Sequence, residues 1–117
     1  MSKNKRKPII MPKINIKPLS VNNAWQGKRF KTNLYKSYEQ ELFYLLPKLK
    51  IPEGKLRLKL LFGLSSKAGD LDNPVKPFID ILQKKYLFND KKIYKLEIEK
   101  IDVKKGKEFI SFEIMSI

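Results

Sequence analysis

Two aspartates on alternate residues, Asp70 and Asp72, are the side chains of this sequence best suited to chemistry. They precede Asn73 and Pro74, at a point where we expect a strand to pass into a helix. Alternate residues of an extended backbone face the same side, so the two carboxylates would repel each other. The positive end of a following helix offsets part of that cost. A divalent cation between them would remove it, and oxygen ligands suit Mg²⁺ or Mn²⁺.

Three more residues extend this group. Asp90 follows the second predicted helix and can return to the same pocket as a third carboxylate. Lys76 lies four residues after Asp72, where its ammonium group can balance the charge of a phosphate. Asp80 lies four residues after Lys76 and can orient it through an ion pair. The set suits phosphodiester hydrolysis, because a metal ion polarises the phosphoryl oxygen, helps to deprotonate water and stabilises the leaving oxygen.

Each of these residues also has an ordinary structural interpretation. Asp, Asn and Pro are favoured in turns and helix caps for reasons unrelated to catalysis, and we favour that interpretation for the segment 70–74 taken alone. Asp90 beside Asn89 is typical of a turn, and Lys76 of a solvated helix position. Only the combination supports catalysis.

The spacing of apolar residues predicts two helices that position this group. The first covers residues 33–46 and ends at Pro47. The second follows Pro74, with Asp72 or Asn73 as its N-cap. Its apolar face carries Val75, Phe78, Ile79 and Leu82.

Four strands complete the prediction. Residues 13–17, between prolines, suit an edge strand, and residues 55–62 alternate as a half-buried, central strand does. Residues 93–103 and 108–115 are expected to form a terminal hairpin around the turn 104–107, with a bulge where the apolar parity changes between Ile98 and Ile101. The order β-α-β-α-β-β indicates an α/β (α+β) fold with a single layer of mixed β-sheet and two helices.

Charge and composition restrict the class of protein. The chain has 117 residues, 26 Lys and Arg against 12 Asp and Glu, and a formal net charge of +14. This excess favours nucleic acid as the partner. With no Cys and no His, disulfides and thiolate or imidazole metal sites are excluded. We expect a basic flexible tail over residues 1–8 and one domain over residues 9–117.

Membrane association is not expected. No apolar run approaches the roughly 20 residues that span a bilayer. The basic N-terminus is followed by only a few apolar residues, far short of the apolar region of a signal peptide, so a cytoplasmic location is predicted.

The segment 20–32 is predicted to be a loop that contacts DNA. Lys28, Arg29 and Lys31 can bind phosphates while Phe30 stacks on an unpaired base. For Trp25 and Tyr35 we favour the alternative, in which the rings anchor the loop on the core. Elsewhere in the chain, Lys104, Lys105 and Lys107 have two open interpretations: a solvated turn, or contact with a distal duplex arm.

Several of these residues together resemble the RusA-like Holliday junction resolvases. The matching motifs are Gly69-Asp70-Leu71-Asp72-Asn73, Lys76, Asp80, Asn89-Asp90 and Ile93, with Ser20-Val21-Asn22-Asn23 similar to the family's N-terminal Ser-x-Asn motif. The resemblance spans roughly residues 18–103. Many members carry an Asp–Asp pair where this chain has Asn89-Asp90, and Asp90 is aligned with the second Asp because Ile93 then keeps its place.

The resemblance implies a homodimeric endonuclease that resolves four-way DNA junctions by paired symmetric nicks in recombination and repair. Mg²⁺, or Mn²⁺ as a substitute, would be held by Asp70, Asp72 and Asp90. Lys76 would be the catalytic lysine and Asp80 a supporting residue. The DNA contacts would come from Asn22, Lys28, Arg29, Phe30 and Lys31. A bacterial cell is the implied setting, with a phage or prophage origin also open.

Two other functions compete with this one. A non-catalytic basic module that binds nucleic acid predicts metal-independent binding without cleavage. A structural or interaction protein, whose basic surface meets an acidic protein, predicts weak DNA binding. The convergence of three acids and Lys76 argues against the second.

Overall fold

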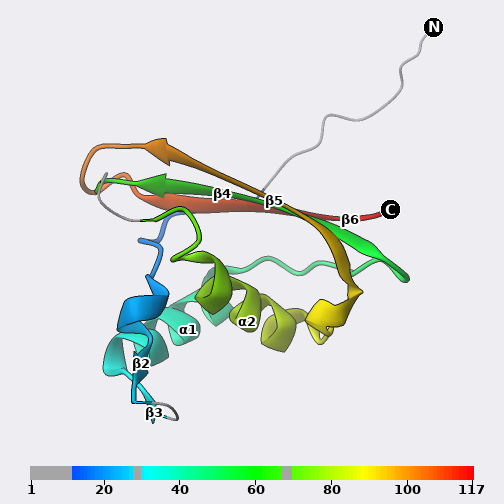
Figure 1. The fold of residues 1–117 in the computed structure, drawn as a ribbon, viewed down its shortest axis with the longest axis horizontal. Coiled ribbons are helices and arrows are strands. Elements are labelled where there is room, and N and C mark those ends of the chain that lie inside the picture. Colours follow the sequence, from blue (N-terminus) through cyan, green and yellow to red (C-terminus); the bar gives the residue numbers. More distant parts are fainter. Residues whose placement is uncertain (1–11, 28–29, 67–69) are drawn as a thin grey trace, which may run out of the picture.

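The computed structural model describes residues 12–27, 30–66 and 70–117 (Figure 1). The predicted tail, Lys28, Arg29 and Gly69 therefore lie outside the described residues. Two helices, α1 (Asn33–Leu45) and α2 (Val75–Tyr86), cover one face of a four-stranded sheet. Two single-turn 3₁₀ helices are also present. The first, η1 (Val21–Asn23), lies before α1 in the chain, and the second, η2 (Asp90–Lys92), follows α2.

The main sheet has the order β1-β6-β4-β5 and is mixed, as predicted. Its strands are β1 (Lys13–Ile14), β4 (Leu56–Leu64), β5 (Ile93–Asp102) and β6 (Phe109–Ser116). The pair β4·β5 is parallel, whereas β4·β6 and β1·β6 are antiparallel. The expected edge position of β1 and central position of β4 are both confirmed.

The core lies between the helices and the sheet. Alternate residues of β4 are buried, including Leu58 and Phe62, and face the apolar sides of both helices. The ring of Phe78 on α2 packs edge-on against Phe62 at 6.2 Å and Phe112 at 5.7 Å between centroids. This packing fixes α2 against the strand that precedes it.

The prediction of a terminal hairpin was wrong. Strands β5 and β6 follow each other in sequence, but β4 lies between them in the sheet. Strand β4 pairs with β5 along one edge and with β6 along the other over nearly its whole length. The expected bulge was also misplaced, since the only register shift of β5 lies at Tyr94, between Ile93 and Lys95.

The segment predicted to be a plain loop contains a small hairpin. Strands β2 (Trp25–Gln26) and β3 (Phe30–Lys31) pair antiparallel beside η1 and project away from the main sheet (Figure 1). Strands of two residues are too short to show an alternating pattern, so sequence periodicity does not reveal them.

Gly63 allows a close approach within the sheet. A Cβ atom at this position would lie 2.4 Å from two carbons of the Phe109 ring. Phe109 is the first residue of β6 and pairs with Gly63 across the strands. Only a hydrogen atom fits there.

Candidate active site

A pocket of about 280 Å³ opens where β4 ends and the approach to α2 begins. Asp70 lines it, together with Asn73 from the same segment. Parts of the chain distant in sequence complete its wall: Lys17, Ser20, Asn23, Leu64, Ser65, Ser66, Pro74 and Glu108. The structure thus brings the predicted catalytic segment to the carboxyl end of the central strand.

The backbone around Asp70 and Asp72 turns instead of running extended. The Asn73 N–H donates to the Asp70 carbonyl oxygen at 3.2 Å, and the Val75 N–H donates to the Asp72 carbonyl oxygen at 3.1 Å. The expectation that an extended backbone aligns the two carboxylates was therefore wrong. Both side chains are nevertheless exposed on the approach to α2.

The first turn of α2 lacks the usual stabilising groups. Pro74 occupies the N-cap, and no side chain caps the helix, so the prediction of Asp72 or Asn73 as cap was wrong. The first turn also contains no acidic residue. The partial positive charge of this helix end is therefore not neutralised from within the helix.

Lys76 adds a full positive charge to the same end. Its Nζ lies 3.4 Å from a carboxylate oxygen of Asp80, which confirms the predicted ion pair. The Lys76 side chain is 67% exposed and that of Asp80 is 24% exposed. Asp80 can thus orient the lysine while leaving its ammonium group open to solvent.

The Ser-x-Asn segment packs directly against the aspartate turn. The Val21 N–H donates to the Asn73 carbonyl oxygen at 2.8 Å, which ties η1 to the start of α2. Ser20 and Asn23 line the pocket. The predicted DNA contact Asn22 lies between them and is exposed, with its N–H donating to the Ser20 hydroxyl at 3.2 Å.

Sequence reasoning missed a second acid beside Asp70. The Ser65 hydroxyl donates to Glu108 at 2.6 Å, and the Gly106 N–H donates to its other oxygen at 2.9 Å. The hydrogen bond from Ser65, more than any other contact, lowers the pKa of Glu108. Nothing in the sequence pairs residue 108 with residue 65, because the link depends on β6 lying next to β4.

Asp90 lies away from the other two aspartates. Its N–H donates to the side-chain oxygen of Gln83 at 2.8 Å. Gln83 is eight residues into α2 from Val75, which is about 12 Å along a helix axis. Among the described residues, no group of three or more acidic side chains is close enough to hold a metal ion. One copy of the chain thus brings Asp70 and Asp72 to one end of α2 and leaves Asp90 beside its second half.

The β2–β3 hairpin presents Phe30 to solvent on a firmly held base. Thr32 caps α1 by accepting the Tyr35 N–H at 3.1 Å, and its hydroxyl donates to the Asn23 carbonyl at 2.6 Å. The Trp25 and buried Tyr35 rings pack in a T-shaped arrangement, 5.7 Å between centroids. Trp25 thus contacts the buried Tyr35 as expected, although it is 36% exposed, whereas Phe30 is 74% exposed.

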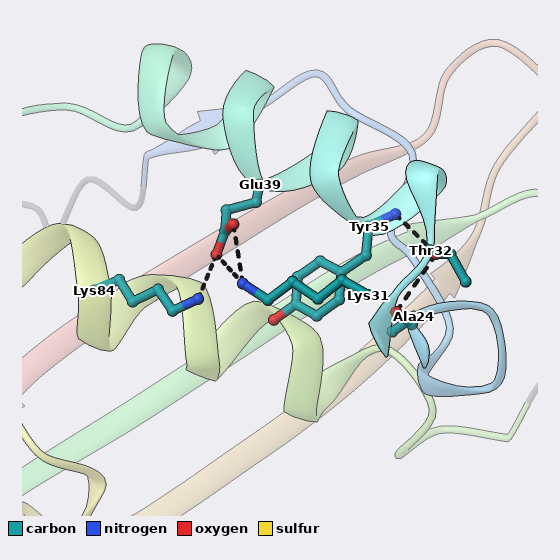
Figure 2. A network of polar contacts seen from close by, with 6 residues as sticks. All are labelled: Ala24, Lys31, Thr32, Tyr35, Glu39 and Lys84. Carbon is teal, nitrogen blue, oxygen red and sulfur yellow. Dashed lines mark hydrogen bonds and ion pairs between the residues drawn. The ribbon is translucent and has the colours of Figure 1, made fainter. Parts of the chain in front are cut away.

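Lys31 is held by an ion-pair network instead of pointing freely into solvent (Figure 2). Its Nζ lies 3.3 Å from Glu39, and Lys84 of α2 lies 2.7 Å from the same carboxylate. Burial raises the pKa of Glu39, but the hydrogen bonds from both lysines outweigh it and give a net lowering. The Lys84 ammonium, bound to the same carboxylate, lowers the pKa of Lys31. The hairpin is thereby fixed to both helices.

Comparison with known proteins identifies the family of the chain. No helix in the described part of the chain is long and apolar enough to cross a membrane. A search of curated proteins finds no match. The family model described as Endodeoxyribonuclease RusA matches residues 15–113, which include the aspartate turn, Lys76, Asp90 and the hairpin. The chain therefore belongs to the RusA endodeoxyribonuclease family.

Proposed function

We propose that this protein is a metal-dependent, homodimeric endonuclease that resolves four-way DNA junctions by paired symmetric nicks during recombination and repair. The observation that carries the proposal is the start of α2, where Asp70 and Asp72 precede an uncapped helix end that bears Lys76. Exposed carboxylates can hold a cation there, and the helix end with its lysine can receive a phosphate.

The donor set fits Mg²⁺, with Mn²⁺ as a substitute. Asp70 and Asp72 offer carboxylate oxygens, and the chain contains no His or Cys to favour a softer metal. When bound, the cation would polarise the scissile phosphate and lower the pKa of a water molecule. Two carboxylates are a sparse ligand set, so the proposal requires Asp90 as the third.

The chain's own residues would orient the phosphate. Lys76, exposed and held by Asp80, would place a positive charge against its non-bridging oxygens. The partial positive charge at the start of α2, which no side chain caps, would add to that field. Asp80 acts through Lys76 and is a positioning residue.

A second copy of the chain would account for the position of Asp90. Within one copy it is too far along α2 to share an ion with Asp70 and Asp72. A two-fold axis that sets two α2 helices antiparallel would bring Asp90 of each copy to the Asp70 end of the other. Each of the two sites would then contain ligands from both copies and would cut one strand of a symmetric junction.

The hairpin supplies the proposed contact with branched DNA. Phe30 is exposed on a rigid base and can stack on an unpaired base at the junction centre. Lys28 and Arg29, outside the described residues, and Asn22 would contact phosphates. Because Lys31 is bound to Glu39, we expect its main effect on DNA to come through the position of the hairpin.

The decisive test compares cleavage by wild type and Asp72→Asn. A labelled four-way junction and a linear duplex are incubated with Mg²⁺ or with EDTA. We expect symmetric, metal-dependent nicking of the junction by wild type, and a rate lower by roughly a hundredfold or more in a variant that still binds. Glu53→Gln, which removes an exposed acid from the loop before β4, is the matched control and should cut normally. Tight binding without cleavage in any metal would instead indicate a non-catalytic DNA-binding module.

Mixed dimers test whether each site is shared between two copies. Asp72→Asn and Asp90→Asn should each be inactive alone. In a dimer that pairs the two variants, one shared site keeps all three aspartates, so nicking of one strand should return. If all three ligands came from one chain, both sites of the mixed dimer would be broken and no nicking would return.

A further inference from the structure

A second hollow, of about 470 Å³, lies next to the candidate active site. It is formed by the chain around β1 and by the connection from β5 to β6. Lys13 and Lys17 line it from the first segment, and Gly106, Lys107 and Glu108 from the second. Antiparallel pairing of β1 with the start of β6 brings the two segments together.

The hollow and the active-site pocket share a wall. Lys17 and Glu108 line both of them, so the two depressions are adjacent, and a duplex long enough to extend beyond the Asp70 pocket on this side would reach the hollow. Figure 1 shows the β5–β6 connection beyond the end of β4, at the same end of the sheet as the start of α2. This neighbourhood exists because β4 separates β5 from β6: their connection must pass across the end of β4, where the pocket opens.

The hollow has a net positive charge. Three lysines face one glutamate among its lining residues, which gives a balance of +3 − 1 = +2. Both oxygens of that glutamate already accept hydrogen bonds, from Ser65 and Gly106. Lys104 and Lys105, in the turn closed by the Lys107 N–H donating to the Lys104 carbonyl, extend the charge outward and are exposed.

Several cations elsewhere in the described residues are held in ion pairs. Lys31 and Lys84 share Glu39, Lys76 pairs with Asp80, and Arg57 lies between Glu97 and Glu113. No ion pair joins the lysines at the hollow to any carboxylate in the described ranges: Lys13, Lys17, Lys104, Lys105 and Lys107. Lys13 Nζ lies over the Phe109 ring, 4.7 Å from its centroid, and the charge of Lys17 acts on Glu108, so Lys104, Lys105 and Lys107 are the lysines most available to an external polyanion.

We propose that Lys13, Lys17, Lys104, Lys105 and Lys107 form a second DNA-contact surface, which binds the phosphates of a duplex arm as it leaves the Asp70 pocket. This inference rests on the proposed function, because it assigns the partner of the surface beside that site. The hairpin with Phe30 would hold the junction centre, and this surface would hold one arm. Its contacts are to phosphates, so it adds affinity without sequence preference.

The test measures junction binding in EDTA, without cleavage, as a function of salt concentration. Lys105→Gln/Lys107→Gln removes two charges from the surface. Lys48→Gln/Lys50→Gln removes two exposed lysines from the segment between α1 and β4 and is the matched control. The slope of log affinity against log salt becomes shallower by about 0.9 for each phosphate that the protein no longer neutralises. We expect the first variant to lose up to about two units of slope for each protomer, with roughly tenfold weaker binding, and the control to match wild type.

Three outcomes would overturn the assignment. A wild-type slope in Lys105→Gln/Lys107→Gln would show that these lysines do not contact DNA. Equal changes of slope in the two double variants would show that only overall charge matters. Failure of wild type to bind the junction would show that this DNA is not the ligand of the surface. Wild-type nicking of the junction with Mg²⁺ tests the proposed function separately, because it does not depend on the salt slope.

Discussion

The two ends of α2 are built in opposite ways. The first turn has no side-chain cap, no acid and a lysine at its second residue. The last turn has Lys84 and Lys85, which suit the negative end of a helix, and each of them is tied to α1. The Tyr86 hydroxyl also donates to the Pro47 carbonyl at 2.5 Å. The end that bears the candidate catalytic residues is left electrostatically open, whereas the other end stabilises the fold.

The largest expected difference between the ends is in cleavage. Lys76→Ala should slow junction cutting by roughly a hundredfold, because it removes the cation proposed to face the phosphate. Lys84→Ala should cut at the wild-type rate and lose less than about 1 kcal/mol of unfolding free energy. Single-turnover cleavage and chemical denaturation measure the two effects. Similar cleavage rates in the two variants would abolish the functional distinction between the ends.

The C-terminal end of α2 can be made more stable by a single substitution. Leu87, the C-cap, has φ 56°, in the left-handed region, and its side chain is 88% exposed. A non-glycine residue in this conformation costs roughly 1–2 kcal/mol. Glycine avoids that cost, but it loses more backbone entropy on folding, which offsets part of the benefit. Leu87→Gly should therefore raise the free energy of unfolding by up to about 1 kcal/mol, as measured by urea denaturation. Leu87→Ala, which keeps a Cβ atom, is the control and should show no comparable gain.

The smallest effect is a pH dependence of stability at the C-terminal end. The folded state lowers the pKa of Glu39, so its stabilising contribution is present above the ordinary value of 4.5 and is lost as the pH falls through the lower folded value. Glu39→Gln should thus be less stable than wild type by about 0.5 kcal/mol at neutral pH, with the gap closing in acid. Denaturation at pH values above and below this range tests it. A gap that stays constant would assign the loss to packing.

Much of the fold could be predicted from the sequence, because helices and long strands impose a period on their apolar residues. The residues of α1 and α2, the central β4 and the edge strand β1 were all predicted from spacing. The pairing of β5 with β4 could not be predicted from the sequence. A short lysine-rich turn between two strands looks the same in sequence whether the strands pair with each other or lie on either side of a third strand. The pairing of β4 with both strands decides that question, and this pairing exists only in the folded chain.

For the candidate site, one contact was predicted correctly and other parts of the geometry were not, while the catalytic roles of its residues stay predictions. The aspartate segment, Lys76 and its ion pair with Asp80 were found from spacing along one helix. The separation of Asp90 from Asp70 was not predicted. This separation depends on how far the chain runs back along α2 after the helix has ended. Glu108 escaped notice for the same reason: its neighbour Ser65 is 43 residues away in sequence.

Because Gly63 has no side chain, the Phe109 ring can lie close to the β4 backbone, one residue from the pocket wall at Glu108. An added methyl group would occupy space now filled by the Phe109 ring. The Phe109 ring would have to move, and the residue before it, Glu108, accepts the hydrogen bond from Ser65 and lines both the pocket and the hollow. A position in the interior of the sheet that carries no chemistry of its own thus lies next to the strand end that forms the wall of the candidate site.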